Sequence, residues 1–264
     1  MTILALYSNK GGVGKTAAAV NLAYLAAQSG YATLICDLDP QSSTTYYFRV
    51  KPKLKRKARG FTRWNKHINR SIKGTDYELL DLLPADFNHR NLDITFGALR
   101  RRKHRLNIVL KPYEHEYDLI ILDCPPTVNI LAENIFNSAD YLLVPLIPTI
   151  LSIRTHEQLL DFLKENRYRA KGVFAFLSMV DARKKMHQEI SANLVGEFEG
   201  VLNTSIPYLS VIEQLGIYRE PVPAFAPQSL GAQAYQGLWR EIQSKLVKHG
   251  ELLETSGRLN TEIL

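Results

Sequence analysis

The stretch from Tyr7 to Thr16, YSNKGGVGKT, has the residue types that a protein uses to hold a chain of phosphates. The general phosphate-loop pattern is G-x-x-x-x-G-K-[ST], and Gly14, Lys15 and Thr16 match its end. Glycines let the backbone approach an anion closely, the lysine reaches the outer phosphates, and the threonine hydroxyl binds Mg²⁺. The stretch therefore predicts a nucleotide site.

The same stretch departs from the general pattern at one position. Asn9 occupies the place of the first glycine, and a second lysine, Lys10, follows it. These two residues leave open whether the loop is a damaged nucleotide site or a different kind of one.

Carboxylates follow two further apolar runs. Asp37 and Asp39 end ATLICDLDP, and Asp123 ends the apolar part of YDLIILDCPP. Side-chain alternation along a strand places Asp37 and Asp39 on one face. Each aspartate alone could be a turn residue or a helix cap. Together with a phosphate loop, they fit phosphoryl transfer, in which carboxylates position the metal and the attacking water.

The elements that carry these residues alternate between strand and helix patterns. Residues 2–8 and 32–40 read as buried strands around a helix over 15–30, which makes a βαβ unit. Further strands are expected in 117–126, 140–148 and 172–181, and helices in 155–166, 186–198 and 230–249. This order predicts an α/β fold with a doubly wound, mostly parallel sheet and helices on both faces. Ligands of such sheets bind at the carboxyl ends of the strands, where these motifs lie.

Composition limits the other possibilities. The 264 residues, 45% of them hydrophobic, form one predicted domain, 1–264. Two cysteines, Cys36 and Cys124, make neither a disulfide framework nor a metal cluster. No apolar run reaches the about 20 residues of a membrane span, and no signal peptide is recognisable, so a cytoplasmic location is expected.

Positive charge is concentrated in a few segments. The net charge is +7, which favours a polyanionic partner. Residues 49–75 form a predicted insertion with eleven Lys or Arg and no acid, and RRRKHR follows at 100–105. Two smaller basic groups are Arg183 to Lys185 and the helix with Arg240, Lys245 and Lys248.

The motif KGGVGKT resembles the deviant Walker A box of the ParA/MinD family of ATPases. The resemblance extends to DLDPQ, which is similar to the first switch of that family, and to DCPP, which is similar to the second. It implies a P-loop NTPase fold of the deviant Walker A type, with ATP and Mg²⁺ as cofactors. It also implies that Lys10 reaches across a dimer interface to the partner's ATP. A second lysine would repel Lys15 in a monomer, but it becomes favourable where two triphosphates lie between two subunits. The resemblance therefore implies that Asn9 marks a variant phosphate loop rather than a damaged one.

Site residues follow from the resemblance, position by position. Lys10, Lys15 and Asp39 would be catalytic, with Asp39 orienting the attacking water. Thr16, Asp37 and Asp123 would serve the metal. FLSMVDARKK and SIPYLSVIEQLG resemble segments that flank adenine. The ATP-binding residues would be Lys10, Gly11, Gly12, Val13, Gly14, Lys15, Thr16, Ala17, Met179, Asp181 and Pro207.

The function implied is that of the ParA (Soj-like) branch. Such a protein forms a homodimer with ATP, binds DNA without sequence preference, and segregates or positions a plasmid, chromosome or other cargo. A ParB-like or cargo adaptor would stimulate slow hydrolysis of ATP to ADP and phosphate. The protein would then associate with the nucleoid. The candidate DNA contacts are Arg183, Lys184, Lys185, Arg240 and Lys245.

Other members of the same superfamily fit less well. A MinD-like ATPase that works on a membrane is the main alternative, and it would need a basic amphipathic C-terminal helix. The last fifteen residues instead hold three glutamates and one arginine. An iron–sulfur carrier needs paired cysteines, which Cys36 and Cys124 do not form. A metabolic ligase would not explain the positive charge.

Overall fold

The chain begins with the predicted βαβ unit: β1 (Thr2–Leu6), α1 (Lys15–Gln28) and β2 (Thr33–Asp37). The structure is a computed structural model, and it describes residues 1–51, 71–85, 92–168, 170–197 and 200–254. All five residues of β1 and all five of β2 are buried, as expected for parallel strands covered on both faces.

The strands form one seven-stranded sheet in the order β3-β4-β2-β5-β1-β6-β7. The remaining strands are β3 (Lys73–Gly74), β4 (Leu80–Leu83), β5 (Leu119–Asp123), β6 (Tyr141–Leu146) and β7 (Gly172–Leu177). All neighbours are parallel except β3, which runs antiparallel to β4. The predicted doubly wound, mostly parallel sheet is therefore confirmed.

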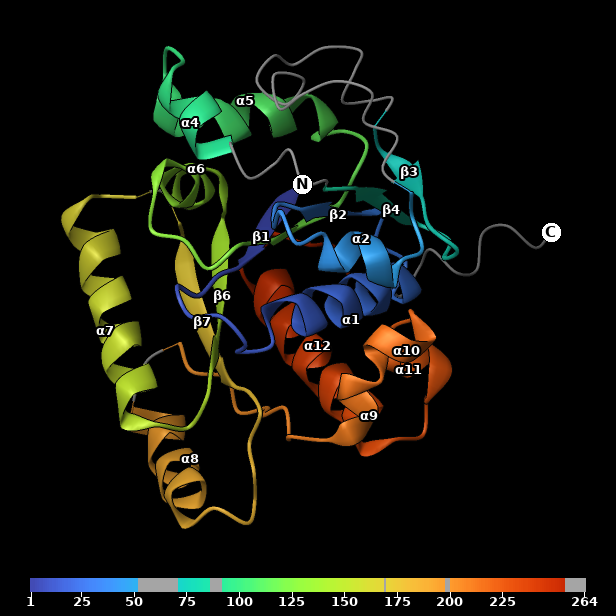
Figure 1. The fold of residues 1–264 in the computed structure, drawn as a ribbon, viewed down its shortest axis with the longest axis vertical. Helices are drawn as coiled ribbons and strands as arrows, with labels where there is room; N and C mark the ends of the chain where they lie inside the picture. The colour runs from blue at the N-terminus through green and yellow to red at the C-terminus, as the bar shows by residue number, and fades with distance from the viewer. Residues whose placement is uncertain (52–70, 86–91, 169, 198–199, 255–264) are drawn as a thin grey trace.

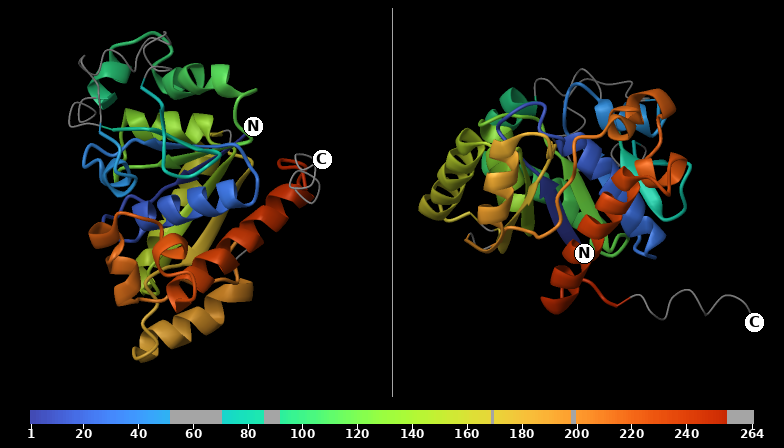
Figure 2. Two further views of the ribbon diagram at one scale, coloured as in Figure 1. Left: turned by 90° about the vertical axis from the view of Figure 1, so that its right-hand side faces the viewer. Right: turned by 90° about the horizontal axis from the view of Figure 1, so that it is seen from below.

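Two helical layers cover the sheet, as Figures 1 and 2 show. Side chains alternate along β1: Leu4 and Leu6 pack with α1 and α12 (Leu230–Lys248), whereas Ile3 and Ala5 face the opposite layer. The opposite layer contains α4 (Leu92–Gly97), α5 (Arg105–Leu110), α6 (Ile130–Ser138), α7 (Ile150–Glu165) and α8 (Lys185–Glu197). The short helices are α2 (Ser43–Tyr47), α9 (Ser210–Glu213), α10 (Leu215–Tyr218), α11 (Val222–Phe225), η3 (Arg102–His104) and η4 (Lys111–Tyr113).

The segment after α8 returns along the free edge of β7. Parallel bridges join Ala175 to Val201 and Val180 to Pro207. The Val180 N–H donates to the carbonyl of Ile206, and the Tyr208 N–H donates to the carbonyl of Val180. This pairing brings Pro207 from a distant part of the sequence to the end of β7, next to Met179.

Several predicted boundaries were wrong. The helix expected from Thr155 begins at Ile150, where the Thr149 side chain caps it by accepting from the Ser152 N–H. The strand expected over 172–181 ends at Leu177, and Met179 adopts a left-handed φ of 55°. Helix α6 and strand β4 were not predicted. Of the basic insertion 49–75, residues 52–70 lie outside the described residues, and Lys73–Gly74 form β3.

Candidate nucleotide site

The phosphate loop connects β1 to α1 and depends on glycine for its shape. Gly12 and Gly14 have φ values of 71° and 90°, which side chains with a Cβ rarely adopt. A Cβ at Gly14 would also lie 2.9 Å from the hydroxyl of Ser178. Helix α1 begins immediately afterwards at Lys15, so its free N–H groups and its dipole point at the loop. The loop has the geometry of an anion site.

Lys15 is the principal cation of this loop. Its side chain is buried, and its Nζ donates to the Lys10 carbonyl at 2.8 Å. Burial lowers the pKa of Lys15, while the nearby carboxyl of Asp123 acts in the opposite direction. A buried ammonium that is bonded to a carbonyl gains from a phosphate, because the phosphate supplies both charge and hydrogen-bond acceptors.

Asp123 ends β5 directly beside Thr16. The Thr16 hydroxyl donates to its Oδ1 at 3.3 Å, and the Thr44 hydroxyl donates to its Oδ2 at 2.8 Å. The carboxyl is fully buried, which raises its pKa. Thr44 lies in α2, so the segment after β2 holds the carboxylate of β5 in place.

Asp37 is held by the same helix. Its Oδ2 accepts from the N–H and the hydroxyl of Thr45 at 2.8 and 2.7 Å, and its Oδ1 accepts from the Asp39 N–H at 3.2 Å. Burial and the neighbouring Asp123 raise the pKa of Asp37. Asp39 itself is half-buried, and its Oδ1 accepts from the Gln41 N–H at 2.9 Å.

These groups fit Mg²⁺ bound together with a nucleotide. Hydroxyl and carboxylate oxygens are the ligands that Mg²⁺ prefers, and it usually keeps waters and takes substrate phosphates as well. Within the described residues there is no cluster of three or more His, Cys, Asp or Glu side chains that could hold a metal alone. Thr16 and Asp123 would hold the ion beside the phosphate loop, and Asp37 would serve its water shell. The charge of the Mg²⁺ ion would offset the negative charge of the two buried carboxylates, Asp37 and Asp123.

A cavity of about 350 Å³ lies over the phosphate loop. It is lined by every loop residue from Gly11 to Ala17, and by Asp39, Met179 and Pro207 among the predicted site residues. Tyr47, Pro126, Tyr208, Ile212 and Tyr235 add further walls. An apolar cavity that adjoins a phosphate loop can accept the base and sugar of a nucleotide.

Comparison with known proteins agrees with this geometry. A family model described as an AAA domain matches residues 1–175. The chain is 28% identical over 252 residues to the chromosome-partitioning ATPase Soj of Treponema pallidum, covering 92% of this chain and 97% of that one. It is 29% identical to the virulence plasmid ParA family protein pGP5-D of Chlamydia psittaci, covering 96% and 99%. The chain belongs to the ParA/MinD family of ATPases.

Solved structures share the fold of this family. Cobyrinic acid a,c-diamide synthase of Mycobacterium smegmatis, with bound ADP and magnesium, superposes with a TM-score of 0.77 at 24% identity, covering 95% of this chain and 97% of that chain. The septum site-determining protein MinD of Pyrococcus horikoshii, complexed with Mg-ADP, gives 0.74 at 21% identity, covering 96% and 99%. By sequence, the chain is similar to the Soj-like branch.

Two of the residues expected at ATP do not line the cavity over the loop. Lys10, which the resemblance assigns to the partner's ATP, lines a second pocket beside α7. Asp181 does not line that cavity either: its carboxylate accepts two hydrogen bonds from the Arg183 guanidinium, each at 2.9 Å. These contacts hold the pKa of Asp181 well below its usual range.

The sequence reasoning missed Thr44, Thr45 and Ser178. Thr44 and Thr45 follow the first switch directly, and two adjacent hydroxyls after a carboxylate pair were the available signal. No pattern in the sequence indicated Ser178, because its importance comes from its closeness to Gly14, a residue far away in the sequence. Tyr208 was also missed; its hydroxyl donates to Glu213 at the cavity wall.

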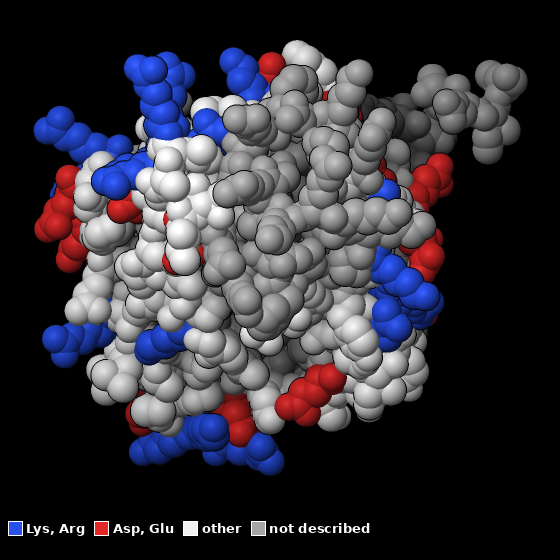
Figure 3. All heavy atoms as spheres, turned by 45° about the horizontal axis from the view of Figure 1, so that its top comes forward, with Lys and Arg blue, Asp and Glu red and all other residues white. Residues whose placement is uncertain are grey.

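On the face shown in Figure 3, the Lys and Arg side chains of the described residues lie in separate groups, with Asp and Glu side chains between some of them. Arg183 pairs with Asp181, and Lys185 lies 3.6 Å from Glu189. Lys245 of α12 lies over the ring of Phe174, which belongs to β7. Arg100, Arg101 and Arg102 are exposed beside η3.

None of the helices in the described part of the chain combines the length and the apolar character needed to cross a bilayer.

Proposed function

We propose that the protein binds ATP with Mg²⁺ at this site and hydrolyses it slowly. The observation that supports the proposal is the meeting of Lys15, Thr16 and Asp123 at the carboxyl ends of β1 and β5, with Asp39 on the cavity wall. Phosphoryl transfer needs positioning and charge more than covalent help. Lys15 would hold the outer phosphates, and Asp39 would orient the attacking water.

The same proposal includes a homodimer that encloses two ATP molecules. Lys10 carries the signature charge of the family, and it lines the pocket beside α7 rather than the cavity over the phosphate loop. That position supports a role in the partner's site instead. We also propose that the chain forms a single domain, because strands from Thr2 to Leu177 share one sheet.

The ATP dimer would bind DNA without sequence preference and would move a plasmid, chromosome or other cargo with an adaptor protein. Arg183, Lys184, Lys185, Arg240 and Lys245 are the proposed contacts. Each would neutralise a phosphate and release counterions. Relatives whose names describe chromosome partitioning or a virulence plasmid support this cellular role.

Fluorescence anisotropy on a random DNA duplex tests the proposal. The chain is titrated with ATP and Mg²⁺, with ADP, and without nucleotide, each over a series of salt concentrations. We expect binding with ATP alone, and we expect it to weaken steeply with salt. Lys15→Ala serves as the control that cannot use ATP. Absence of ATP-dependent binding at low salt would contradict the DNA role.

The MinD-like alternative is tested in parallel with vesicles. Anionic vesicles replace the duplex in a sedimentation assay under the same three nucleotide conditions. Robust ATP-dependent binding to vesicles, without binding to DNA, would place the membrane-based function first.

A further inference from the structure

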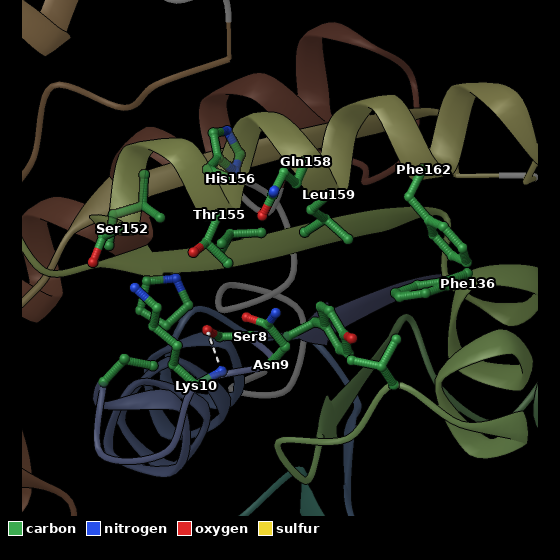
Figure 4. Close-up of a pocket in the computed structure, with 16 residues that line it drawn as sticks. Ser8, Asn9, Lys10, Phe136, Ser152, Thr155, His156, Gln158, Leu159 and Phe162 are labelled. Atoms are coloured by element: carbon green, nitrogen blue, oxygen red, sulfur yellow. Dashed lines mark hydrogen bonds between the residues drawn. The ribbon is translucent and has the colours of Figure 1, made fainter. Parts of the chain in front are cut away.

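A second pocket, with a volume of about 200 Å³, lies between α7 and the segment that enters the phosphate loop. Figure 4 shows Ser8, Asn9 and Lys10 on one side of it, and Thr155, Leu159 and Phe162 projecting from α7 on the other. Phe136 of α6 closes one end, with its ring centroid 6.2 Å from that of Phe162. The pocket is distinct from the cavity over the loop, although Val13 lines both.

The α7 wall of this pocket is an apolar face that the protein leaves incompletely packed. Leu159 and Phe162 point toward the sheet, yet both are only half-buried. Native cores leave few spaces larger than a water molecule. An apolar pocket of this size favours a flat or branched apolar group, since such a group would make contacts with both walls.

The polar groups at the pocket select the charge of an occupant. Of its lining residues, all within the described chain, Lys10 is the only Lys, Arg, Asp or Glu. The side-chain amides of Asn9 and Gln158 form no hydrogen bond among the described residues. The Nδ1 atom of buried His156 also has no partner there. The positive charge of Lys10 therefore favours an anionic group over a cationic one, and the free amides can donate hydrogen bonds to it.

We propose that this pocket binds a small aromatic carboxylate, with its ring against Leu159 and Phe162 and its carboxylate at Lys10. The binding step does not depend on the function proposed above. The contacts around the pocket also connect it to the nucleotide site. Lys10 accepts from Lys15 Nζ through its carbonyl, and its N–H donates to the Ser8 hydroxyl at 3.2 Å.

Tyr7 adds a second connection, to the segment after DCPP. Its hydroxyl donates to the carbonyl of Thr127 at 2.9 Å, and the residue lines the pocket. An occupant that pairs with Lys10 would withdraw that lysine from a partner's ATP. This consequence rests on the proposed function: the ligand would oppose ATP-dependent dimerisation and leave ATP binding by the monomer intact.

The binding test uses indole-3-acetate and, as a matched neutral probe, 3-methylindole. Calorimetry or ligand-observed NMR on the full chain without nucleotide should give saturable binding of indole-3-acetate, with a Kd of about 1 mM or tighter. 3-Methylindole should bind about fivefold more weakly, because it lacks the ion pair. Lys10→Ala should abolish that difference. Equal binding of the two probes to the wild-type chain would overturn the charge preference.

A pocket-filling variant locates the binding. Leu159→Phe should weaken indole-3-acetate by about tenfold or more, since the larger ring occupies the space. Leu151→Phe makes the same change at an exposed position of α7 outside the pocket and should leave the Kd unchanged. No saturable binding, or no effect of Leu159→Phe, would overturn the proposal. Should Leu159→Phe fail to fold, NOEs from the probe to Phe136 and Phe162 of the wild-type chain decide: their presence supports the pocket, and their absence overturns it.

The regulatory consequence is measured separately by light scattering with ATP and Mg²⁺. Saturating indole-3-acetate should reduce the dimer fraction, while 3-methylindole should not. A dimer fraction unchanged by a bound probe would overturn the link to Lys10. Failure of the chain to dimerise with ATP alone would instead contradict the proposed function, and the binding result would stand.

Discussion

Asp37 and Asp123 lie opposite each other in the register of β2 and β5, and the two residues are 1% and 0% exposed. Two buried carboxyl groups on neighbouring strand ends disfavour each other's ionisation, and burial disfavours it further. Both pKa values are raised, chiefly by burial; the Asp123 carboxyl adds to the shift of Asp37, and the Asp39 carboxyl adds to that of Asp123. The two carboxyl groups lie where a cation bound with the nucleotide would supply positive charge and favour their ionised forms.

The first prediction concerns stability against pH. A carboxyl whose pKa is raised on folding adds stability below its unfolded pKa of about 4, and that stability is lost as pH rises through the folded value. Asp37→Asn should therefore reduce the loss of Tm between pH 5 and pH 8 by about 3 °C in nucleotide-free protein. Thermal unfolding at both pH values measures this.

The exposed α7 residue Asp161 provides the control for this experiment. Asp161→Asn should leave the pH dependence of the wild type unchanged, since the side chain is in solvent. Parallel loss of Tm in the wild type and in Asp37→Asn would show that the buried carboxyl does not destabilise the nucleotide-free chain.

The second prediction concerns Thr44, which holds Asp123 from α2. Thr44→Val keeps the shape of the side chain but removes the 2.8 Å hydrogen bond to Oδ2. We expect the affinity for Mg²⁺ in the presence of ATP to fall by about tenfold, because a partner that orients a metal ligand is lost. ATP binding without Mg²⁺ should change little. Titration of Mg²⁺ against fluorescent ATP measures both.

Thr44→Ser distinguishes the effect of the hydroxyl from that of the methyl group, because serine keeps the first and lacks the second. It keeps the donor, so its Mg²⁺ affinity should match that of the wild type. An equal loss in both variants would attribute the effect to packing in α2 rather than to the hydrogen bond.

The sequence was sufficient for the elements whose patterns are local. The βαβ unit, β5 and the carboxylates at the strand ends follow from apolar runs, alternation and glycine spacing, and the structure has them in these places. Helix α7 was predicted five residues too short because its first turn carries Ile150 and Leu151 in solvent, so it lacks the one-sided apolar pattern of a packed helix.

The parts that could not be predicted depend on contacts between distant residues. Thr44 and Asp123 are 79 residues apart, and no spacing rule joins a hydroxyl after one switch to the carboxylate of another. The pairing of Asp181 with Arg183 is local, but it is an alternative to the contact with adenine that was expected for Asp181. A sequence pattern does not decide which of two such interactions prevails.

The third prediction separates the two lysines of the phosphate loop. Lys15→Ala removes the buried cation that faces the phosphates, so ATP affinity should fall by about a hundredfold or more. Lys10→Ala should keep ATP binding by the monomer within about threefold and should prevent the ATP-dependent dimer. Calorimetry and light scattering with ATP and Mg²⁺ measure the two effects. A Lys10→Ala chain that still dimerises with ATP would exclude the proposed contact across the interface.

The last prediction concerns Asp39, which lines the nucleotide cavity and accepts from the Gln41 N–H. Asp39→Ala removes the carboxylate proposed to orient water but leaves Lys15, Thr16 and Asp123 in place. ATP binding should persist, and phosphate release should fall by about a hundredfold, because positioning of the attacking water is lost. The ATP dimer should therefore accumulate, which light scattering over time would show. Gln41→Ala is the matched control: it leaves the carboxylate and the backbone N–H that holds it, so hydrolysis should continue near the wild-type rate. Rapid hydrolysis by Asp39→Ala would show that another group orients the attacking water.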